Sequence, residues 1–225
     1  MKKLVIFDLD GTLLDTIEDL GEATNYALRT CGFPQHALSS YPMFVGNGVT
    51  RLIERVLPED ARTPANVETM RGHFTEYYDR HCTDHSRPYN GISDMLAYLD
   101  SKNISLAVAS NKYHRAVEKL IGHFFPDINW VAVEGHKENM PVKPDPSIVF
   151  DILCKCPTPK SEVLYAGDSG VDMETARRAC VESVGVTWGF RPVRELREAL
   201  ADHIVTLPAA IIPIVEERSP LGQGL

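Results

Sequence analysis

Two kinds of apolar pattern alternate along this chain. Short apolar runs rich in β-branched side chains are typical of buried strands, and apolar residues that recur every three or four positions are typical of helices. The runs predict strands at 4–7, 104–109, 130–133, 163–167 and 184–189, with a short edge strand at 204–205. The helical spacing predicts helices at 91–101, 115–121, 147–153 and 173–180. Strands and helices that alternate in this way predict an α/β fold with a doubly wound parallel sheet.

The segment 16–86 interrupts this alternation because its pattern is helical throughout. Its apolar positions predict helices at 17–31, 49–57 and 67–78, and no strong strand pattern separates them. A helical block inserted between the first strand and the next βα unit is typical of a cap on an α/β core. The sequence therefore predicts three parts: a core of residues 1–15 and 87–215, an all-helical cap of residues 16–86 with linkers near Asp15 and Arg87, and a flexible tail of residues 216–225.

The composition limits the partners and the location. With 225 residues, of which 44% are apolar and 24% charged, the chain can bury a sizeable core. Its net charge of −8 argues against nucleic acid or an anionic membrane as the main partner. No apolar run approaches the roughly 20 residues that span a bilayer, and no signal sequence is recognisable, so we expect a cytoplasmic protein. The five cysteines are scattered, which favours reduced thiols.

The first indication of chemistry comes where the strand 4–7 ends. Asp8 and Asp10 are two residues apart, so they can face the same crevice at the carboxyl edge of the sheet, and Gly11 permits a sharp turn after them. Two carboxylates this close repel each other unless they share a cation. Mg²⁺ binds carboxylates together with phosphate oxygens, so the pair suggests phosphoryl chemistry. The alternative is a turn with solvated acids.

Further polar groups fall near the ends of later strands. Ser110 and Asn111 follow the second predicted strand and could donate hydrogen bonds to a phosphate, although they could also cap the next helix. Lys143 lies between prolines that fix the backbone and could be a cation for phosphate, although a loop lysine is often only solvated. Asp168 and Asp172 follow the fourth predicted strand and would complete an acidic site for one metal. If these residues were only solvated or only capped helices, that would have to be true independently at four strand ends or loops, so a shared site is the better interpretation.

The first acidic motif, Asp8-Leu9-Asp10-Gly11-Thr12, resembles the first signature of the haloacid dehalogenase superfamily, in the phosphatase version in which both acids are aspartate. The later motifs of the superfamily also match in order: Ser110 with Asn111, Lys143 before Pro144, and Gly167-Asp168-Ser169 with Asp172. Together these motifs span essentially the whole chain. The resemblance implies that the parallel sheet is a Rossmann-like core.

The resemblance also implies a role for each matched residue. Asp8 would be the nucleophile that attacks phosphorus, and Asp10 the general acid and then the general base. The phosphoryl oxygens would be bound by Ser110 and Lys143, and the amide of Asn111 at the same strand end is a further candidate for binding phosphate. Mg²⁺ would be held by the acidic motifs, through Asp8, the Asp10 carbonyl and Asp168, with Asp172 acting through water or supporting a ligand. A carboxylate attacks phosphate well only when cations neutralise the incoming charge, which the metal and Lys143 would do.

Differences within the superfamily favour hydrolysis of a small phosphomonoester. A dehalogenase lacks the second acid, so Asp10 argues against carbon–halogen cleavage, and the β-phosphoglucomutase type has a histidine about where this chain has Leu20. The cap segment 44–52 resembles that of phosphoglycolate phosphatases. In this segment Gly46 and Gly48 would contact the substrate and Arg51 could meet its carboxylate, although the glycines could simply start a helix and leave Arg51 solvated.

We therefore predict a Mg²⁺-dependent phosphatase that acts through an aspartyl-phosphate on a small phosphorylated metabolite, with 2-phosphoglycolate as the favoured substrate. Another small-metabolite phosphatase, a pyrophosphatase of the same fold and a sugar-phosphate mutase remain alternatives. A non-enzymatic binding protein is the weakest alternative, because such a protein has no use for all four groups together. The sequence does not indicate the oligomeric state.

Overall fold

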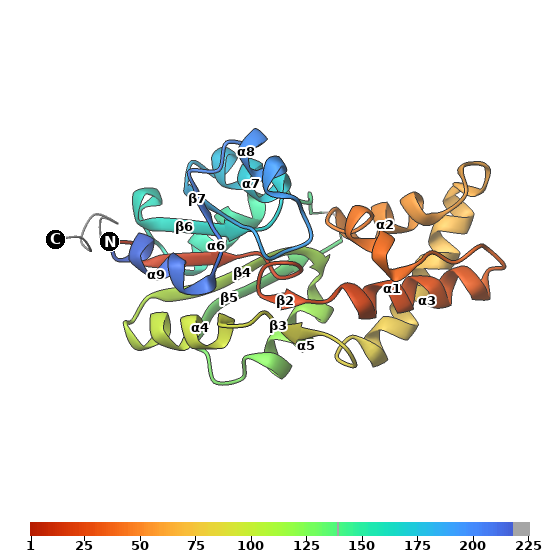
Figure 1. The fold of residues 1–225 in the computed structure, drawn as a ribbon, viewed down its shortest axis with the longest axis horizontal. Helices are drawn as coiled ribbons and strands as arrows, with labels where there is room; N and C mark the ends of the chain where they lie inside the picture. Colours follow the sequence, from red (N-terminus) through yellow and green to blue (C-terminus); the bar gives the residue numbers. More distant parts are fainter. Residues whose placement is uncertain (139, 218–225) are drawn as a thin grey trace.

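A six-stranded parallel sheet forms the centre of the core in the computed structural model, which describes residues 1–138 and 140–217 (Figure 1). The strands are β1 (Leu4–Phe7), β4 (Ser105–Tyr113), β5 (Trp130–His136), β6 (Val163–Gly167), β7 (Glu182–Val186) and β8 (His203–Val205). They lie in the order β5-β4-β1-β6-β7-β8, and each neighbouring pair is parallel. Because later strands are added on both sides of β1, the sheet is doubly wound, which confirms the predicted fold class.

The side chains of β1 show how the two faces of this sheet are covered. Val5 and Phe7 belong to one apolar cluster, whereas Leu4 and Ile6, which point the opposite way, belong to a second cluster. The first face packs against α4 (Ile92–Ser101), α5 (His114–Phe124) and α9 (Ile211–Val215), and the second against α6 (Ser147–Lys155) and α7 (Gly170–Ala179). Burial of both faces explains why the sequence of β1 is a continuous apolar run.

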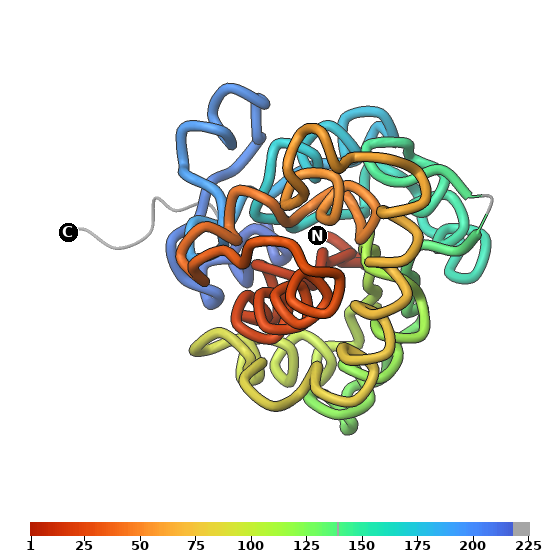
Figure 2. Tube along the Cα trace, turned by 90° about the vertical axis from the view of Figure 1, so that its right-hand side faces the viewer, coloured from red at the N-terminus to blue at the C-terminus, as the bar shows by residue number. Residues whose placement is uncertain are grey.

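The cap is connected to the core through a short antiparallel ribbon. This ribbon pairs β2 (Leu14–Asp15) with β3 (Arg87–Pro88), at the positions of the two expected linkers. Between the two strands lie α1 (Ile17–Thr30), α2 (Gly48–Val56) and α3 (Pro64–His81). In Figure 1 these helices lie beyond the carboxyl end of the sheet, and Figure 2 shows the same red, orange and yellow helices toward the viewer.

A buried carboxylate fixes the point where the chain leaves the cap. Asp19 on α1 accepts hydrogen bonds from the backbone N–H groups of His85 and Ser86, at 2.9 and 2.8 Å, and from the Ser86 hydroxyl at 2.6 Å. These hydrogen bonds compensate for the burial of the charge. Asp19 therefore holds the segment before β3 against the first helix of the cap.

The remaining described elements are short. They are α8 (Val193–Glu198) and four 3₁₀ helices, at Leu38–Met43, Glu59–Ala61, Lys160–Glu162 and Pro208–Ala210. The sequence pattern does not predict α8, α9 or the ribbon, because segments this short do not show a period. None of the helices in the part of the chain that the structure describes is long and apolar enough to cross a membrane. The tail predicted at 216–225 lies outside the described residues except for 216 and 217.

One strand differs from its prediction in a way that matters for function. The sequence predicts that the strand ends at residue 109, but β4 continues to Tyr113. It does so because it keeps pairing with β5, with Ser110 opposite Gly135 and Tyr113 opposite His136, across an irregularity between these two pairs. Ser110 and the two residues after it therefore lie within the last part of the strand rather than in a loop.

Candidate active site

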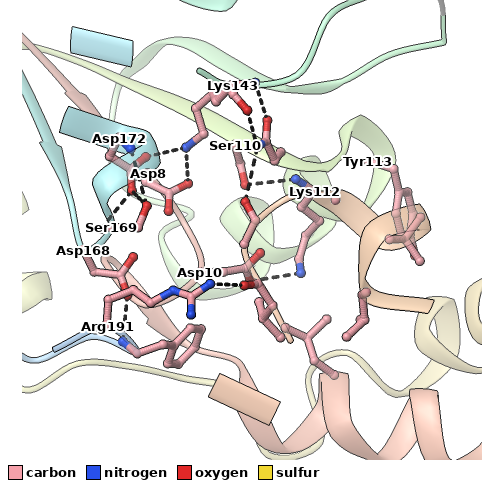
Figure 3. A pocket seen from close by; sticks show the side chains of 18 of the residues that line it. Asp8, Asp10, Ser110, Lys112, Tyr113, Lys143, Asp168, Ser169, Asp172 and Arg191 are labelled. Carbon is pink, nitrogen blue, oxygen red and sulfur yellow. Dashed lines mark hydrogen bonds and ion pairs between the residues drawn. The ribbon is translucent and has the colours of Figure 1, made fainter. Parts of the chain in front are cut away.

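Four segments that are far apart in the sequence meet at the carboxyl edge of the sheet (Figure 3). Asp8 follows β1, Ser110 lies near the end of β4, Asp168 follows β6, and Lys143 comes from the loop before α6. Because the chain builds the sheet outward from both sides of β1, this strand lies at the topological switch point, where open α/β sheets bind ligands. The structure brings together the core residues that the sequence motifs select.

Lys143 lies at the centre of this group, with four acceptors within hydrogen-bonding distance. Its Nζ atom is 2.8 Å from Asp8 Oδ1 and 2.7 Å from Asp172 Oδ1, and it lies 2.9 and 3.2 Å from the Ala109 carbonyl and the Tyr165 hydroxyl. Burial by itself would lower the pKa of Lys143, but the charges of Asp172 and Asp8 raise it well above its ordinary value. Lys143 is therefore a fixed positive charge beside Asp8.

The side chain of Asn111 positions the loop that carries Lys143. Its Oδ1 atom accepts from the Lys143 backbone N–H at 2.7 Å, and its Nδ2 atom lies 3.2 Å from the carbonyl oxygens of both Lys143 and Gly46. A phosphate contact by Asn111, as the sequence suggests, would compete with these backbone hydrogen bonds. Ser110 lines the pocket, and its hydroxyl oxygen accepts from the Lys112 backbone N–H at 3.2 Å, so the hydroxyl can still donate to a ligand.

Three buried carboxylates surround one point of the site. One oxygen each from Asp8, Asp168 and Asp172 lies within 4.8 Å of the others. Burial, only partly offset by Lys143, raises the pKa of Asp8 to about 7, and burial together with the charges of Asp172 and Asp8 raises the pKa of Asp168 well above its ordinary value. When all three carboxylates are ionised, the one lysine leaves two negative charges uncompensated, which is why burial favours the protonated forms of Asp8 and Asp168 until a cation binds. A divalent cation with oxygen ligands fits this donor set.

The two acids that follow β6 are held in different ways. Both oxygens of Asp172 accept hydrogen bonds. Oδ1 accepts from Lys143, and Oδ2 accepts from the hydroxyl and the N–H of Ser169 at 2.6 and 3.2 Å. Ser169 is also the N-cap residue of α7. Asp168 accepts from the Phe190 N–H at 2.7 Å. Gly11, with φ of +84°, passes so close to Asp168 that a Cβ atom there would lie 2.4 Å from its carboxylate. Asp8 and Asp168 are thus better placed than Asp172 to bind a cation directly.

Asp10 lies apart from these three carboxylates. Its Oδ1 atom accepts a hydrogen bond from the Thr16 hydroxyl at 2.6 Å and lies 2.9 Å from Lys112 Nζ. Within the described residues, the group of acids that could share a metal contains Asp8 but not the Asp10 side chain. The Asp10 carboxylate is therefore separate from the candidate metal site and is free to exchange a proton with a ligand.

The site opens into a small pocket between the core and the cap. The cavity has a volume of about 60 Å³, and the cap contributes an apolar wall together with the backbone of Gly46 and Gly48. The apolar residues of this wall come from α1, α2, α3 and the loop before α2: Leu20, Val45, Val49, Leu52 and Phe74. A cavity of this size holds a few water molecules or a small metabolite.

Arg51 does not line this pocket. Its side chain is 67% exposed and forms an ion pair with Glu54 at 2.6 Å, three residues further along α2. It lies instead at a wider depression bordered by α2, α3 and part of the segment 136–142. Contact between Arg51 and a substrate in the pocket requires another arrangement of the cap, and this role stays a prediction.

The sequence analysis does not single out four other residues that line the pocket, namely Tyr78, Lys112, Phe190 and Arg191. Arg191 donates to the Val45 carbonyl at 2.8 Å and lies 3.9 Å from Glu195, so it links the cap loop to α8. For Lys112 the sequence contains one signal, because it directly follows Ser110 and Asn111. The others come from segments without a recognisable motif.

A buried carboxylate beside a fixed lysine, a place for a divalent cation and a second acid together define a phosphoryl-transfer hydrolase with a Rossmann-like core. Comparison with known families agrees with this class. The profile of the haloacid dehalogenase-like hydrolases matches residues 5–186, which is most of the chain. The chain belongs to this family, and it is a phosphatase within it.

Relatives named phosphoglycolate phosphatase are similar over nearly the whole chain. The protein from Pseudomonas syringae pv. tomato is 32% identical over 214 residues, which cover 89% of this chain and 76% of the relative. The protein from Haemophilus influenzae is 29% identical over 219 residues, which cover 95% and 98% of the two chains. Among solved structures, a candidate phosphoglycolate phosphatase from Lactobacillus delbrueckii subsp. bulgaricus superimposes with a TM-score of 0.89 at 32% identity, covering 96% of this chain and 99% of that one.

Proposed function

We propose that this protein is a Mg²⁺-dependent phosphatase that hydrolyses 2-phosphoglycolate through an aspartyl-phosphate on Asp8. The observation that carries the proposal is the group of three buried carboxylates, Asp8, Asp168 and Asp172, of which Lys143 pairs with only two. When ionised, this group has excess negative charge that a divalent cation would compensate. The relatives named phosphoglycolate phosphatase and the small volume of the pocket support this choice of substrate.

The first half of the reaction transfers the phosphoryl group to the protein. A carboxylate oxygen of Asp8 forms a bond to phosphorus while the bond from phosphorus to the substrate alcohol oxygen breaks. Lys143, fixed 2.8 Å from Asp8, places a positive charge beside the incoming phosphoryl group and so reduces the repulsion between the two anions. The hydroxyl of Ser110 donates a hydrogen bond to a phosphoryl oxygen. When bound, Mg²⁺ supplies further neutralisation of the phosphoryl charge, with Asp8 and Asp168 as its protein carboxylates.

Asp10 acts as the general acid in the first half of the reaction and as the general base in the second. As a general acid it gives its proton to the leaving alcohol oxygen, and as a general base it then takes a proton from the water that attacks the phosphorus of the aspartyl-phosphate. That attack breaks the bond between phosphorus and the Asp8 oxygen and releases inorganic phosphate. The hydrogen bond from Thr16 holds Asp10 apart from the three clustered acids, where it can serve a leaving group on the cap side.

A mutase is less well supported than a hydrolase. The wall of the pocket at the start of the cap is Leu20, which has no group that could take a proton from a sugar hydroxyl. Water activated by Asp10 is therefore the better acceptor for the phosphoryl group.

The cytoplasmic location expected from the sequence stays a prediction.

The test is a panel of substrates with and without metal. Release of inorganic phosphate is measured from 2-phosphoglycolate, p-nitrophenyl phosphate, pyrophosphate and glucose 1-phosphate, with Mg²⁺ or with EDTA. We expect the highest kcat/KM for 2-phosphoglycolate and loss of turnover with EDTA. A higher value for pyrophosphate, or conversion of glucose 1-phosphate to glucose 6-phosphate without phosphate release, would contradict the proposed substrate.

Metal binding can be measured without turnover. Mg²⁺ should raise the melting temperature of the wild-type protein, because a ligand that binds only the folded state stabilises it by about 2.7 kcal/mol at a concentration 100 times its Kd. The variant Asp168→Asn should lose most of this shift. Asp151→Asn, which changes an exposed acid on α6, serves as the control and should keep it.

A further inference from the structure

Lys112 and Tyr78 form a polar group on the cap side of the pocket that the phosphoryl-transfer chemistry does not use. The side chain of Lys112 is only 4% exposed, and Figure 3 shows it extending toward Asp10, away from the pair formed by Lys143 and Asp172. Its Nζ atom also lies 4.7 Å from the centre of the Tyr78 ring. One buried lysine is thus shared between the core strand β4 and the cap helix α3.

The hydroxyl of Tyr78 is the second part of this group. It is fully buried, lines the pocket, and has no hydrogen-bond partner among the described residues. The ring itself is well packed, because it stacks on Phe74 with centroids 5.3 Å apart and meets Tyr113 edge to face at 6.4 Å. A buried donor without an acceptor is unfavourable, and phenylalanine would fill the same space without this penalty. A ligand that enters the pocket and accepts a hydrogen bond from this hydroxyl would remove the penalty.

The rest of the wall restricts what that acceptor can be. Leu20, Val49, Leu52 and Phe74 offer a ligand apolar contact only. Of the two other described cations at the pocket, Lys143 is paired with Asp8 and Asp172, and Arg191 is held by the Val45 carbonyl at 2.8 Å. Lys112 has one ion pair among the described residues, to Asp10, which leaves ammonium protons for a ligand.

The distances suit a single carboxylate. An ammonium 4.7 Å above the centre of a tyrosine ring lies within about two hydrogen-bond lengths of the hydroxyl of that ring. The two oxygens of one carboxylate can then accept from both groups at once. A neutral hydroxyl of a substrate would satisfy Tyr78 but would not compensate the charge of Lys112.

We propose that Lys112 and Tyr78 bind the carboxylate of the substrate, at the end of the pocket opposite the phosphate, and so select 2-phosphoglycolate among small phosphomonoesters. This inference rests on the proposed function. The substrate carboxylate would then accept the hydrogen bond of the Tyr78 hydroxyl, for which the described part of the chain offers no acceptor.

The test compares two substrates that differ only at this end. In 2-hydroxyethyl phosphate, a CH₂OH group replaces the carboxylate of 2-phosphoglycolate. In the variant Lys112→Met, kcat/KM for 2-phosphoglycolate should fall by about 10- to 100-fold, which is the range for a charge-assisted hydrogen bond, mainly through KM. The value for 2-hydroxyethyl phosphate should fall much less. The ratio of the two values is the readout, because any effect of Lys112 on Asp10 acts on both substrates and cancels.

Three further variants separate binding from packing. Tyr78→Phe should lower the ratio by about 3- to 10-fold and should melt at the same or a higher temperature than the wild type. Tyr77→Phe, the matched control on the neighbouring residue, stacks on Tyr26 outside the pocket and should leave the ratio unchanged. Lys112→Arg should recover part of the ratio lost in Lys112→Met, because it restores a cation.

The outcomes distinguish this inference from the proposed function. If the wild-type protein does not prefer 2-phosphoglycolate over 2-hydroxyethyl phosphate, both the proposed substrate and this inference are wrong. If the wild type shows the preference and Lys112→Met keeps it, the proposed function stands and this inference is wrong. A loss of the ratio in Arg191→Ala but not in Lys112→Met would assign the carboxylate to Arg191 instead.

Discussion

The pocket contains two buried lysines among the described residues, Lys143 and Lys112, and they differ in how many protein groups they contact. Lys143 has four acceptors within the protein, two of them carboxylates that are themselves buried. Among the residues that the structure describes, Lys112 forms one ion pair, to the partly exposed Asp10, and its Nζ atom also lies over the face of the Tyr78 ring. The first lysine is held in one place by interactions from several strands, whereas the second keeps protons for a partner that is not part of the chain.

The two lysines therefore have different roles: Lys143 serves phosphoryl transfer, and Lys112 serves the choice of substrate. The group around Lys143 is built only from core residues at the carboxyl ends of strands, so it can act on any phosphate that reaches it. The group around Lys112 is shared with α3 of the cap, so its geometry depends on how the cap lies on the core. The core site should therefore tolerate little change, and the cap-facing site should alter the choice of substrate.

The largest effect is expected at the core, for the nucleophile. Asp8→Asn should lower turnover of every substrate by about 10⁴-fold or more, because an amide cannot attack phosphorus. The fold should be retained, because the change also removes one of three mutually repelling carboxylates. Initial rates are measured beside thermal melting, with Asp151→Asn on the exposed side of α6 as the control. Activity above a few per cent would contradict covalent catalysis, as would the absence of phosphate on Asp8 after acid quenching of the wild type.

A smaller loss that depends on the leaving group is expected for the second acid. Asp10→Asn should lower kcat for 2-phosphoglycolate by about 10²- to 10⁴-fold, the range for general acid–base catalysis. The loss should be smaller for p-nitrophenyl phosphate, because its leaving group departs without a proton. Both substrates are measured with the same preparation. Equal losses would show that Asp10 is not the acid.

The two lysines themselves give the next test, through stability. Lys143→Met leaves Asp8 and Asp172 buried without a cation, so it should lower the free energy of unfolding by about 3–5 kcal/mol, as for other broken buried ion pairs. Lys112→Met should cost less than half of that, because Asp10 is partly exposed and keeps its hydrogen bond from Thr16. Urea unfolding without metal measures both. Equal losses would mean that Lys112 is as firmly built into the fold as Lys143.

The core site could be predicted from the sequence because each of its residues lies at a local signal. Asp8 follows a continuous apolar run, Asp168 follows another, and prolines surround Lys143, so strand ends and loops reveal these positions. Parallel strands then bring their carboxyl ends to one edge without any long-range information. The pairing of Lys112 with Tyr78 could not be predicted in this way, because it depends on how α3 lies on β4. The sequence also ended β4 too early, since pairing with β5 sets that end.

The motif also does not predict the position of the Arg51 side chain, although the apolar pattern of α2 indicates it. The buried residues of α2 are Leu52, Ile53 and Val56, with Val49 packed beside them at the pocket. At helical spacing these positions form one stripe, and position 51 falls nearly opposite to it. The motif resemblance points to Arg51, but the apolar stripe of the helix indicates that its side chain faces outward.

The smallest effect is therefore expected for Arg51→Ala. Arg51 does not line the pocket and is paired with Glu54 at the surface, so kcat/KM for 2-phosphoglycolate should change by less than about threefold. Glu54→Ala removes the same ion pair from the other side and should behave alike. Both variants are measured with 2-phosphoglycolate and 2-hydroxyethyl phosphate. A loss of tenfold or more that is confined to 2-phosphoglycolate, and that Glu54→Ala does not share, would show that Arg51 reaches the carboxylate when the cap moves. The carboxylate site would then belong to α2, and the contrast between the two buried lysines would no longer explain substrate choice.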